Sequence, residues 1–365
     1  MPLHGRLPAA PEVRRPHHPR AARRAACVAL ALGAFAPCSA HGQLAHCAAI
    51  GDDRARLACY DELARTEAPA ATAAPSPAPA PETAAAPASE IEQRWELRPD
   101  LQRGTFRLQP YRALYGLAHY STNMNEQPSS PTRPPPSQDI HLDPFEAKMQ
   151  LSFKSKLAQD MLGTSTDAWF GYTQRSYWQA ANARFSSPFR ETDYEPELVF
   201  VHPLELQWAG VHARYAALSL THQSNGRGES LSRSWNRLIG ELALESGPWS
   251  LSLRPWTRIH ERSGTDDDNP DIDDYVGRGE ITAVYRADGH VVTITGRHTL
   301  RGGTRSRGAA QIDWAFPLTG SLNGHLQLFS GYGESLIDYN HSANYVGLGV
   351  SLIEWYSNTA ETRRR

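Results

Sequence analysis

The feature that most constrains this chain is a series of short segments in which apolar and polar residues alternate. From about residue 103, aromatic and β-branched residues alternate with polar ones in runs of roughly ten residues, separated by turn-forming clusters. We count twelve runs, at 104–117, 145–155, 166–178, 196–207, 211–224, 232–245, 248–261, 275–287, 291–301, 308–317, 321–333 and 343–355. The pattern predicts an all-β fold, a twelve-stranded antiparallel transmembrane β-barrel, which must close because an open edge in lipid leaves unpaired amides.

The connections between these runs alternate in length, as they do in such barrels. Long polar connections follow the first, third, seventh and eleventh runs, and residues 123–143 contain five prolines. Short connections occur at 208–210, 246–247, 288–290 and 318–320. Because periplasmic turns are short and outer loops long, we expect the run 211–224 to end at the outward rim.

Aromatic residues lie near the ends of many runs, where the girdles of a membrane barrel form. They are Trp169, Tyr172, Tyr177, Trp178, Trp249, Trp256, Trp314, Trp355 and Tyr356. In a soluble β protein the same residues would instead lie in a sandwich core.

Composition excludes some other classes of protein. The formal net charge is −2, so no basic excess points to nucleic acid. No apolar run of about 20 residues occurs outside the N-terminus, so no transmembrane helix is expected. A hydrophobic content of 40% fits a soluble protein and also fits a barrel whose strands are apolar on one face.

The N-terminal region divides into three parts. Residues 1–40 have the basic, apolar and small-residue segments of a secretory signal. Residues 41–66 are expected to form a small helical periplasmic cap with a Cys47–Cys59 disulfide, which an oxidising periplasm favours over two free thiols. Residues 67–90, rich in Ala and Pro, form a linker, and residues 91–365 form the barrel.

The hairpin predicted within residues 211–245 places polar side chains on an apolar face. Alternate residues of a strand share a face, so His222 and Ser224 continue a face of alanine and leucine residues. If residues 228–230 form the turn, Asn236 lies directly across from His222, with Cβ atoms roughly 5 Å apart. The side chains of Ser224 and Asn236 are then both within reach of the His222 imidazole.

This arrangement suits nucleophilic catalysis at a membrane. His222 can take the proton that makes Ser224 a nucleophile, and the Asn236 carbonyl oxygen can accept from Nδ1–H. A neutral amide avoids the desolvation cost of a carboxylate facing lipid, although it stabilises the imidazolium less. Alternatively, these are polar rim residues of a hairpin, with His222 in an interfacial belt.

The chain resembles outer membrane phospholipase A of Gram-negative bacteria. The resemblance covers roughly residues 94–355 and rests on long motifs. The matching segments are 186–196 (SSPFRETDYEP), 222–227 (HQSNGR), 232–237 (SRSWNR), 267–272 (DDNPDI) and 330–340 (SGYGESLIDYN).

The resemblance implies an outer-membrane enzyme that hydrolyses acyl esters of phospholipids and lysophospholipids (A1/A2). Its His–Ser–Asn triad falls on His222, Ser224 and Asn236, and its active site faces the outer leaflet. The Gly226 amide and a calcium-bound water would stabilise the oxyanion.

The resemblance also implies calcium and an active homodimer. Calcium would be held by a backbone oxygen of Arg227, the Ser232 hydroxyl and a partner-chain oxygen of Ser186, with Asp268 at a second calcium site. Gln174 matches a residue that hydrogen-bonds across the dimer; alternatively it faces the lumen. Taken singly, the loop residues are also consistent with ordinary turns.

One departure concerns the loop, where Glu229 stands in place of the aspartate usual in the family, which puts calcium affinity in doubt. Two rival interpretations remain. One is a catalytically silent outer-membrane barrel that acts as a pore or scaffold, and the other is a soluble serine hydrolase.

Overall fold

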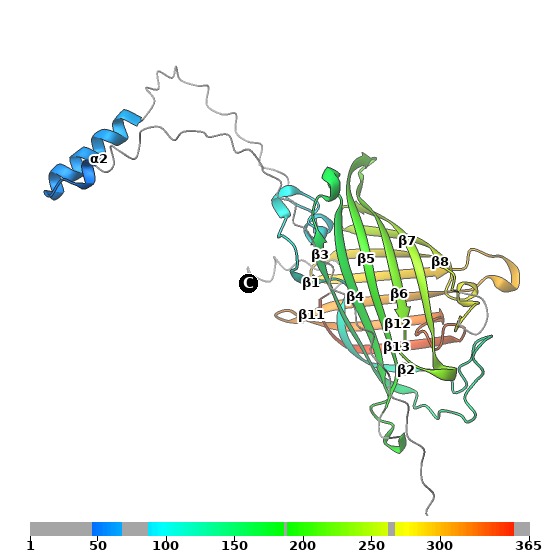
Figure 1. The fold of residues 1–365 in the computed structure, drawn as a ribbon. Coiled ribbons are helices and arrows are strands. Elements are labelled where there is room, and N and C mark those ends of the chain that lie inside the picture. Colours follow the sequence, from blue (N-terminus) through cyan, green and yellow to red (C-terminus); the bar gives the residue numbers. More distant parts are fainter. Residues whose placement is uncertain (1–45, 68–86, 186–187, 262–266, 354–365) are drawn as a thin grey trace, which may run out of the picture. The chain divides into compact units, whose positions relative to one another are not determined.

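The structure is a computed structural model that describes residues 46–67, 87–185, 188–261 and 267–353 (Figure 1). The chain divides into two compact units, residues 1–85 and 86–365. In the first unit, helix α2 spans Asp53–Glu67 and a disulfide joins Cys47 to Cys59, with a Cα–Cα distance of 5.6 Å. The predicted signal peptide and most of the predicted linker lie outside the described residues.

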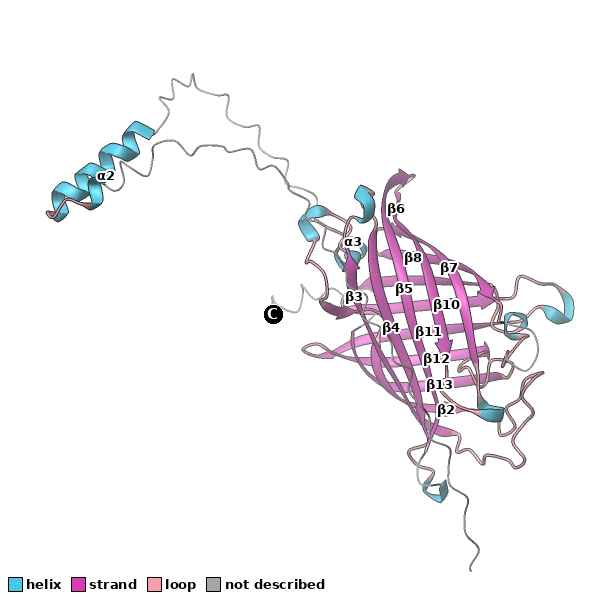
Figure 2. Ribbon diagram, in the orientation of Figure 1, coloured by secondary structure: helices cyan, strands magenta, loops and turns pink. Residues whose placement is uncertain are grey.

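The second unit is a closed barrel of twelve antiparallel strands (Figure 2). The strands are β2 Leu114–Ser121, β3 Phe145–Ala158, β4 Asp167–Trp178, β5 Phe189–Trp208, β6 Val211–Ser224, β7 Ser234–Ser246, β8 Trp249–Ile259, β9 Gly279–Ala287, β10 His290–His298, β11 Gly308–Thr319, β12 Leu322–Tyr332 and β13 Ser342–Ile353. Each strand pairs with its neighbours in sequence, and β13 pairs with β2 to close the ring. The predicted fold is confirmed. None of the helices in the described ranges is long and apolar enough to span a membrane.

Two predicted runs differ most from the observed strands. The run 104–117 is divided, because a short strand β1, Leu108–Pro110, pairs with β3 while β2 begins only at Leu114. Strand β5 begins at Phe189, well before the predicted residue 196. Its early part carries charged side chains that are buried in the interior, so a search for apolar alternation passes over it.

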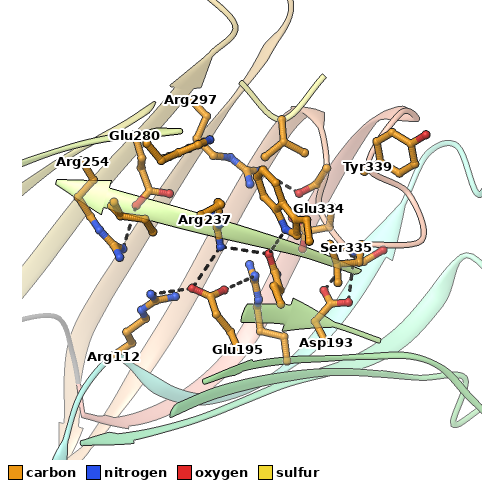
Figure 3. Close-up of a pocket in the computed structure, with 18 residues that line it drawn as sticks. Arg112, Asp193, Glu195, Arg237, Arg254, Glu280, Arg297, Glu334, Ser335 and Tyr339 are labelled. Atoms are coloured by element: carbon orange, nitrogen blue, oxygen red, sulfur yellow. Dashed lines mark hydrogen bonds and ion pairs between the residues drawn. The ribbon is translucent and has the colours of Figure 1, made fainter. Parts of the chain in front are cut away.

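Strand residues alternate between an apolar outer face and a polar interior. On β6, Leu218 and Leu220 are exposed, whereas Ser219 and Thr221 are buried. Ion pairs fill the interior, as Figure 3 shows for the pocket lined by Arg112, Glu195 and Arg237. Arg112 Nη2 lies 2.9 Å from Glu195 Oε1, and such pairing offsets the cost of removing charges from water.

Six of the nine aromatic residues expected at the membrane interfaces fall into two groups. Some are exposed on the outer face, as predicted: Trp178, Trp249 and Trp314. Others are buried within the barrel, so the prediction is wrong for them: Trp169, Tyr177 and Trp256. Trp355 and Tyr356 lie outside the described residues.

One end of the barrel is filled by helix α3, Glu90–Trp95. Ser89 caps this helix: its hydroxyl accepts from the Glu92 N–H, and the Glu92 carboxylate accepts from the Ser89 N–H at 2.7 Å. Trp95 packs against Trp169 and Tyr215, and the centroid of its ring lies 5.5 Å from the ring centroid of each of them. This end of the barrel carries the short β5–β6 turn. The long connections and the tip of the β6–β7 hairpin lie at the opposite end.

Candidate active site

The register of β6 with β7 places His222 directly across from Asn236. Their side chains meet, and His222 Nδ1 lies 2.9 Å from Asn236 Oδ1. An amide oxygen only accepts, so Nδ1 carries the proton and Nε2 is left with a lone pair that can act as a base. His222 is exposed on the same face as Leu220, so the imidazole points outward from the barrel, as the sequence predicts.

Asn236 makes a second hydrogen bond that fixes its orientation. Its Nδ2 donates to Glu261 Oε1 at 3.1 Å, beyond the end of β8. A carboxylate only accepts, so the amide must turn its nitrogen toward Glu261 and its oxygen toward His222. Glu261 was not singled out from the sequence, because no spacing pattern connects it with Asn236.

Ser224 lies two residues from His222 on the same outward face of β6. It is half-buried, and its register partners are Ser234 on β7 and Tyr194 on β5. Among the described residues, the Ser224 hydroxyl makes no hydrogen bond, so its contact with His222 would require side-chain rotation. Catalytic contacts of this kind often tighten only when substrate binds.

Gly226 follows in the loop after β6 with a φ of +63°, a backbone conformation that favours glycine. A Cβ added there would lie 3.2 Å from Tyr194 Cε2, so the ring also restricts the position. Within the described ranges, the Gly226 N–H has no hydrogen-bond acceptor. It is therefore free to donate to a bound group.

The loop beyond Gly226 is held in place by Asn225. The Asn225 side chain accepts from the Arg233 N–H at 3.0 Å and donates to the Leu231 carbonyl at 2.8 Å. Arg227 turns its guanidinium back to β5, where Nε lies 3.3 Å from Glu191 Oε2. Asn225 is a structural residue of the site that the sequence did not identify.

The candidate calcium ligands lie on loops at this end of the barrel. Ser232 Oγ donates to Asp268 Oδ2 at 2.5 Å, so these two predicted ligands are in contact. Ser186 lies outside the described residues, and the side chain of Glu229 is exposed. In the described part of the chain, no three His, Cys, Asp or Glu side chains gather to hold a metal.

Asp268 has a further partner that the sequence did not reveal. Arg133 Nε donates to Asp268 Oδ1 at 2.8 Å, and Ser130 Oγ donates to the Asp268 carbonyl at 2.5 Å. Arg133 is the one cationic residue of the proline-rich segment 123–143, and its charge is the one signal that could have pointed to this contact. A loop remote in sequence thus holds one of the candidate ligands.

Gln174 lies on the outer face of β4. Its register partners, Leu151 on β3 and Tyr194 on β5, are both exposed, whereas the neighbouring Arg175 lines the interior pocket. Gln174 Nε2 donates to Ser176 Oγ at 3.2 Å. The alternative of a lumen-facing glutamine is therefore wrong, and Gln174 shares a cross-strand row with Ser224.

Known proteins are similar to this chain over most of its length. The phospholipase A1 family matches residues 91–352. A putative phospholipase A1 of Neisseria meningitidis is 35% identical over 88% of this chain and 94% of its own length. Phospholipase A1 of Salmonella typhimurium is 37% identical over 68% of this chain and 82% of its own length.

Solved structures give the same result. Outer membrane phospholipase A from Escherichia coli has a TM-score of 0.61 and 33% identity, covering 68% of this chain and 99% of its own. The Salmonella typhi outer membrane phospholipase dimer with bound calcium has a TM-score of 0.63 and 32% identity, covering 73% and 98%. The chain therefore belongs to the outer membrane phospholipase A family, phospholipid-hydrolysing enzymes of the outer membrane.

Proposed function

We propose that this protein is a calcium-dependent phospholipase with A1 and A2 activity, in which Ser224 is the nucleophile, His222 the general base and Asn236 the residue that orients it. The observation that carries the proposal is the hydrogen bond of 2.9 Å between His222 Nδ1 and Asn236 Oδ1. It lies on an outward face among exposed leucines, where acyl chains are within reach. The Escherichia coli enzyme has an active-site mutant in which an asparagine is replaced by alanine, and this supports the role of Asn236.

The reaction would proceed in two stages. His222 Nε2 takes the proton of Ser224 as Oγ attacks the ester carbonyl carbon, and the imidazolium then protonates the leaving lysophospholipid oxygen. Next, His222 deprotonates a water molecule that attacks the acyl-enzyme, releasing the fatty acid and restoring Ser224. In both stages the Gly226 N–H donates to the negatively charged carbonyl oxygen.

The loop residues fit calcium, because Ser232 and Asp268 present only oxygen donors and are already in contact. The carbonyl oxygen of Arg227, the Ser232 hydroxyl and Ser186 of a second copy would hold the ion, with Asp268 at a second site. Bound there, calcium would supply positive charge that stabilises the oxyanion. The Salmonella typhi enzyme forms a dimer with bound calcium, and this supports both the ion and the homodimer.

The same arrangement supports a dimer seam on the outer face of the barrel. Gln174 faces outward in the row that contains Tyr194 and Ser224, so a partner packed over β4 would contact the edge of the active site. The site lies at the end with the long connections, which in barrels of this class faces the outer leaflet.

The test is fatty-acid release from phospholipid mixed micelles. We expect Ser224→Ala to lose nearly all activity and Asn236→Ala to lose part of it. Ser219→Ala is the matched control, since Ser219 lies on the same strand but is buried toward the interior. A Ser224→Ala protein as active as the control would overturn the proposal and favour the silent pore or scaffold.

A further inference from the structure

We propose that Glu261 is a positioning residue of the catalytic site, which orients Asn236 and stabilises the protonated form of His222 through it. This inference rests on the proposed function, in which His222 acts as the base. It adds a charged fourth member to a triad whose third member is neutral.

The first support is a continuous chain of hydrogen bonds. His222 Nδ1 lies 2.9 Å from Asn236 Oδ1, and Asn236 Nδ2 donates to Glu261 Oε1 at 3.1 Å. An amide can adopt either of two flipped orientations, because each of its ends can hydrogen-bond to a polar partner, and a flipped Asn236 would turn two N–H groups toward Nδ1. That orientation would remove the acceptor on which the required tautomer depends. Glu261 opposes the flip, since its carboxylate accepts only from the nitrogen.

The second support is the backbone that carries Glu261. Asn236 pairs with Ile259 at the end of β8, and Ile259 is exposed on the outer face, whereas Arg258 is buried in the interior. Glu261 is two residues beyond Ile259, so continued alternation returns its side chain to the outer face, beside Asn236. The register of β7 with β8 therefore brings Glu261 close to Asn236, and the side chains complete the contact.

The third support is electrostatic. Burial raises the pKa of the Glu261 carboxyl, Asp267 and Asp268 act in the same direction, and Arg258 and His222 lower it. The carboxylate of Glu261 and the imidazole of His222 attract each other when both are charged. Asn236 alone cannot provide this charge. The carboxylate provides it from a loop outside the strands, which avoids placing a charge among the leucines of the outer face.

The experiment separates orientation from charge with two variants. Glu261→Ala removes both the acceptor and the charge, whereas Glu261→Gln keeps an acceptor oxygen for Asn236 and removes only the charge. The matched control is Glu205→Gln, because Glu205 is an exposed carboxylate near the opposite end of β5. For each variant, kcat, KM and the pH dependence of kcat/KM are measured with mixed micelles and calcium.

We expect Glu261→Ala to lower kcat by about three- to tenfold, the effect of one hydrogen bond, without a change in KM. Its acid limb should move to lower pH, since the charge that attracts the imidazolium is gone. Glu261→Gln should recover most of kcat and keep the shifted limb. A purely structural role of the loop would not produce this split.

Two outcomes overturn the inference, and they differ from failure of the proposed function. If Glu261→Ala matches Glu205→Gln in kcat and pH profile while Ser224→Ala is inactive, the triad stands and Glu261 has no part in it. If both Glu261 variants lose kcat equally with an unmoved acid limb, the residue only holds the loop. An active Ser224→Ala protein would instead overturn the proposed function on which the inference rests.

Discussion

The proposed triad and the candidate calcium ligands lie at the same end of the barrel, but they are built in different ways. His222, Ser224 and Asn236 belong to paired strands, so the register of the hairpin fixes their directions. Ser232 and Asp268 lie on loops and meet through a hydrogen bond that spans 36 residues of sequence. Strand pairing needs only local information, whereas the loop contacts depend on the whole fold.

The difference also concerns what each region needs from its surroundings. The bond between His222 and Asn236 joins two residues that the register of neighbouring strands of one chain places opposite each other. In contrast, Asp268 is held by Arg133 from a connection that lies 135 residues away in sequence. We infer that the base is preformed, and that activity is controlled at the loops.

Removal of calcium should have the largest effect, and it tests whether the strand-built and loop-built regions are independent of each other. A chelator should lower fatty-acid release by about a hundredfold or more, since the oxyanion loses its main positive charge. The barrel should be unaffected, because its strands and the β6–β7 hairpin do not depend on the loops. Fatty-acid release and near-ultraviolet circular dichroism measure the two effects, and added calcium should restore the activity.

Equal activity in chelator and in calcium would show that the loops do not hold a catalytic ion. A loss of the barrel's circular dichroism signal on chelation would contradict the separation of the two regions, because the strands would then depend on the metal.

Gly226 connects the two regions. Its substitution should lower activity, but by less than removal of calcium does. Gly226→Ala places a Cβ 3.2 Å from the Tyr194 ring at a φ of +63°, which costs about 1–2 kcal/mol. The backbone should shift and its N–H should no longer point at the oxyanion, so kcat should fall by about tenfold. Steady-state kinetics in the presence of saturating calcium provide the measurement.

Gly228→Ala is the matched control, because Gly228 lies in the same loop with a φ of −110° and no atom near an added Cβ. Equal activity of the two variants would mean that the N–H of Gly226 does not donate to the oxyanion.

The sequence predicted the register of the β6–β7 hairpin correctly because side chains alternate with a period of two. The prediction that Asn236 lies across from His222 needed only the turn centre, and the structure has that register. Gln174 was left open because β4 carries aromatic side chains on both faces: Trp169 is buried inside and Trp178 is exposed outside. The pattern of β4 therefore does not distinguish its outer face from its inner one.

The loop-built part could not be predicted in the same way. Arg133 reaches Asp268, and Glu261 reaches Asn236, through contacts that follow from barrel closure and strand register and not from local spacing. The start of β5 was missed for a related reason. Its interior-facing residues, such as Asp193 and Glu195, are charged, so the strand lacks apolar alternation where it passes through the ion pairs.

Substitution of Arg133 should have the smallest effect. It tests whether activity is controlled at the loops while the base is preformed. The Arg133 guanidinium neutralises Asp268 and must leave or share the carboxylate when calcium binds there. Arg133→Gln should therefore lower the half-saturating calcium concentration by about two- to fivefold, which corresponds to the free energy of a partly exposed ion pair. Calcium binding by calorimetry and dimerisation by cross-linking measure this without reference to activity.

The matched control is Arg301→Gln, which removes a half-buried loop arginine 3.1 Å from Asp274, a carboxylate that is not a candidate ligand. The control should leave calcium affinity unchanged. If Arg133→Gln instead weakens calcium binding, Arg133 holds Asp268 in place for the ion and does not compete with it. The loops would then be as preformed as the strands, and the control of activity would have to lie in the pairing of two copies.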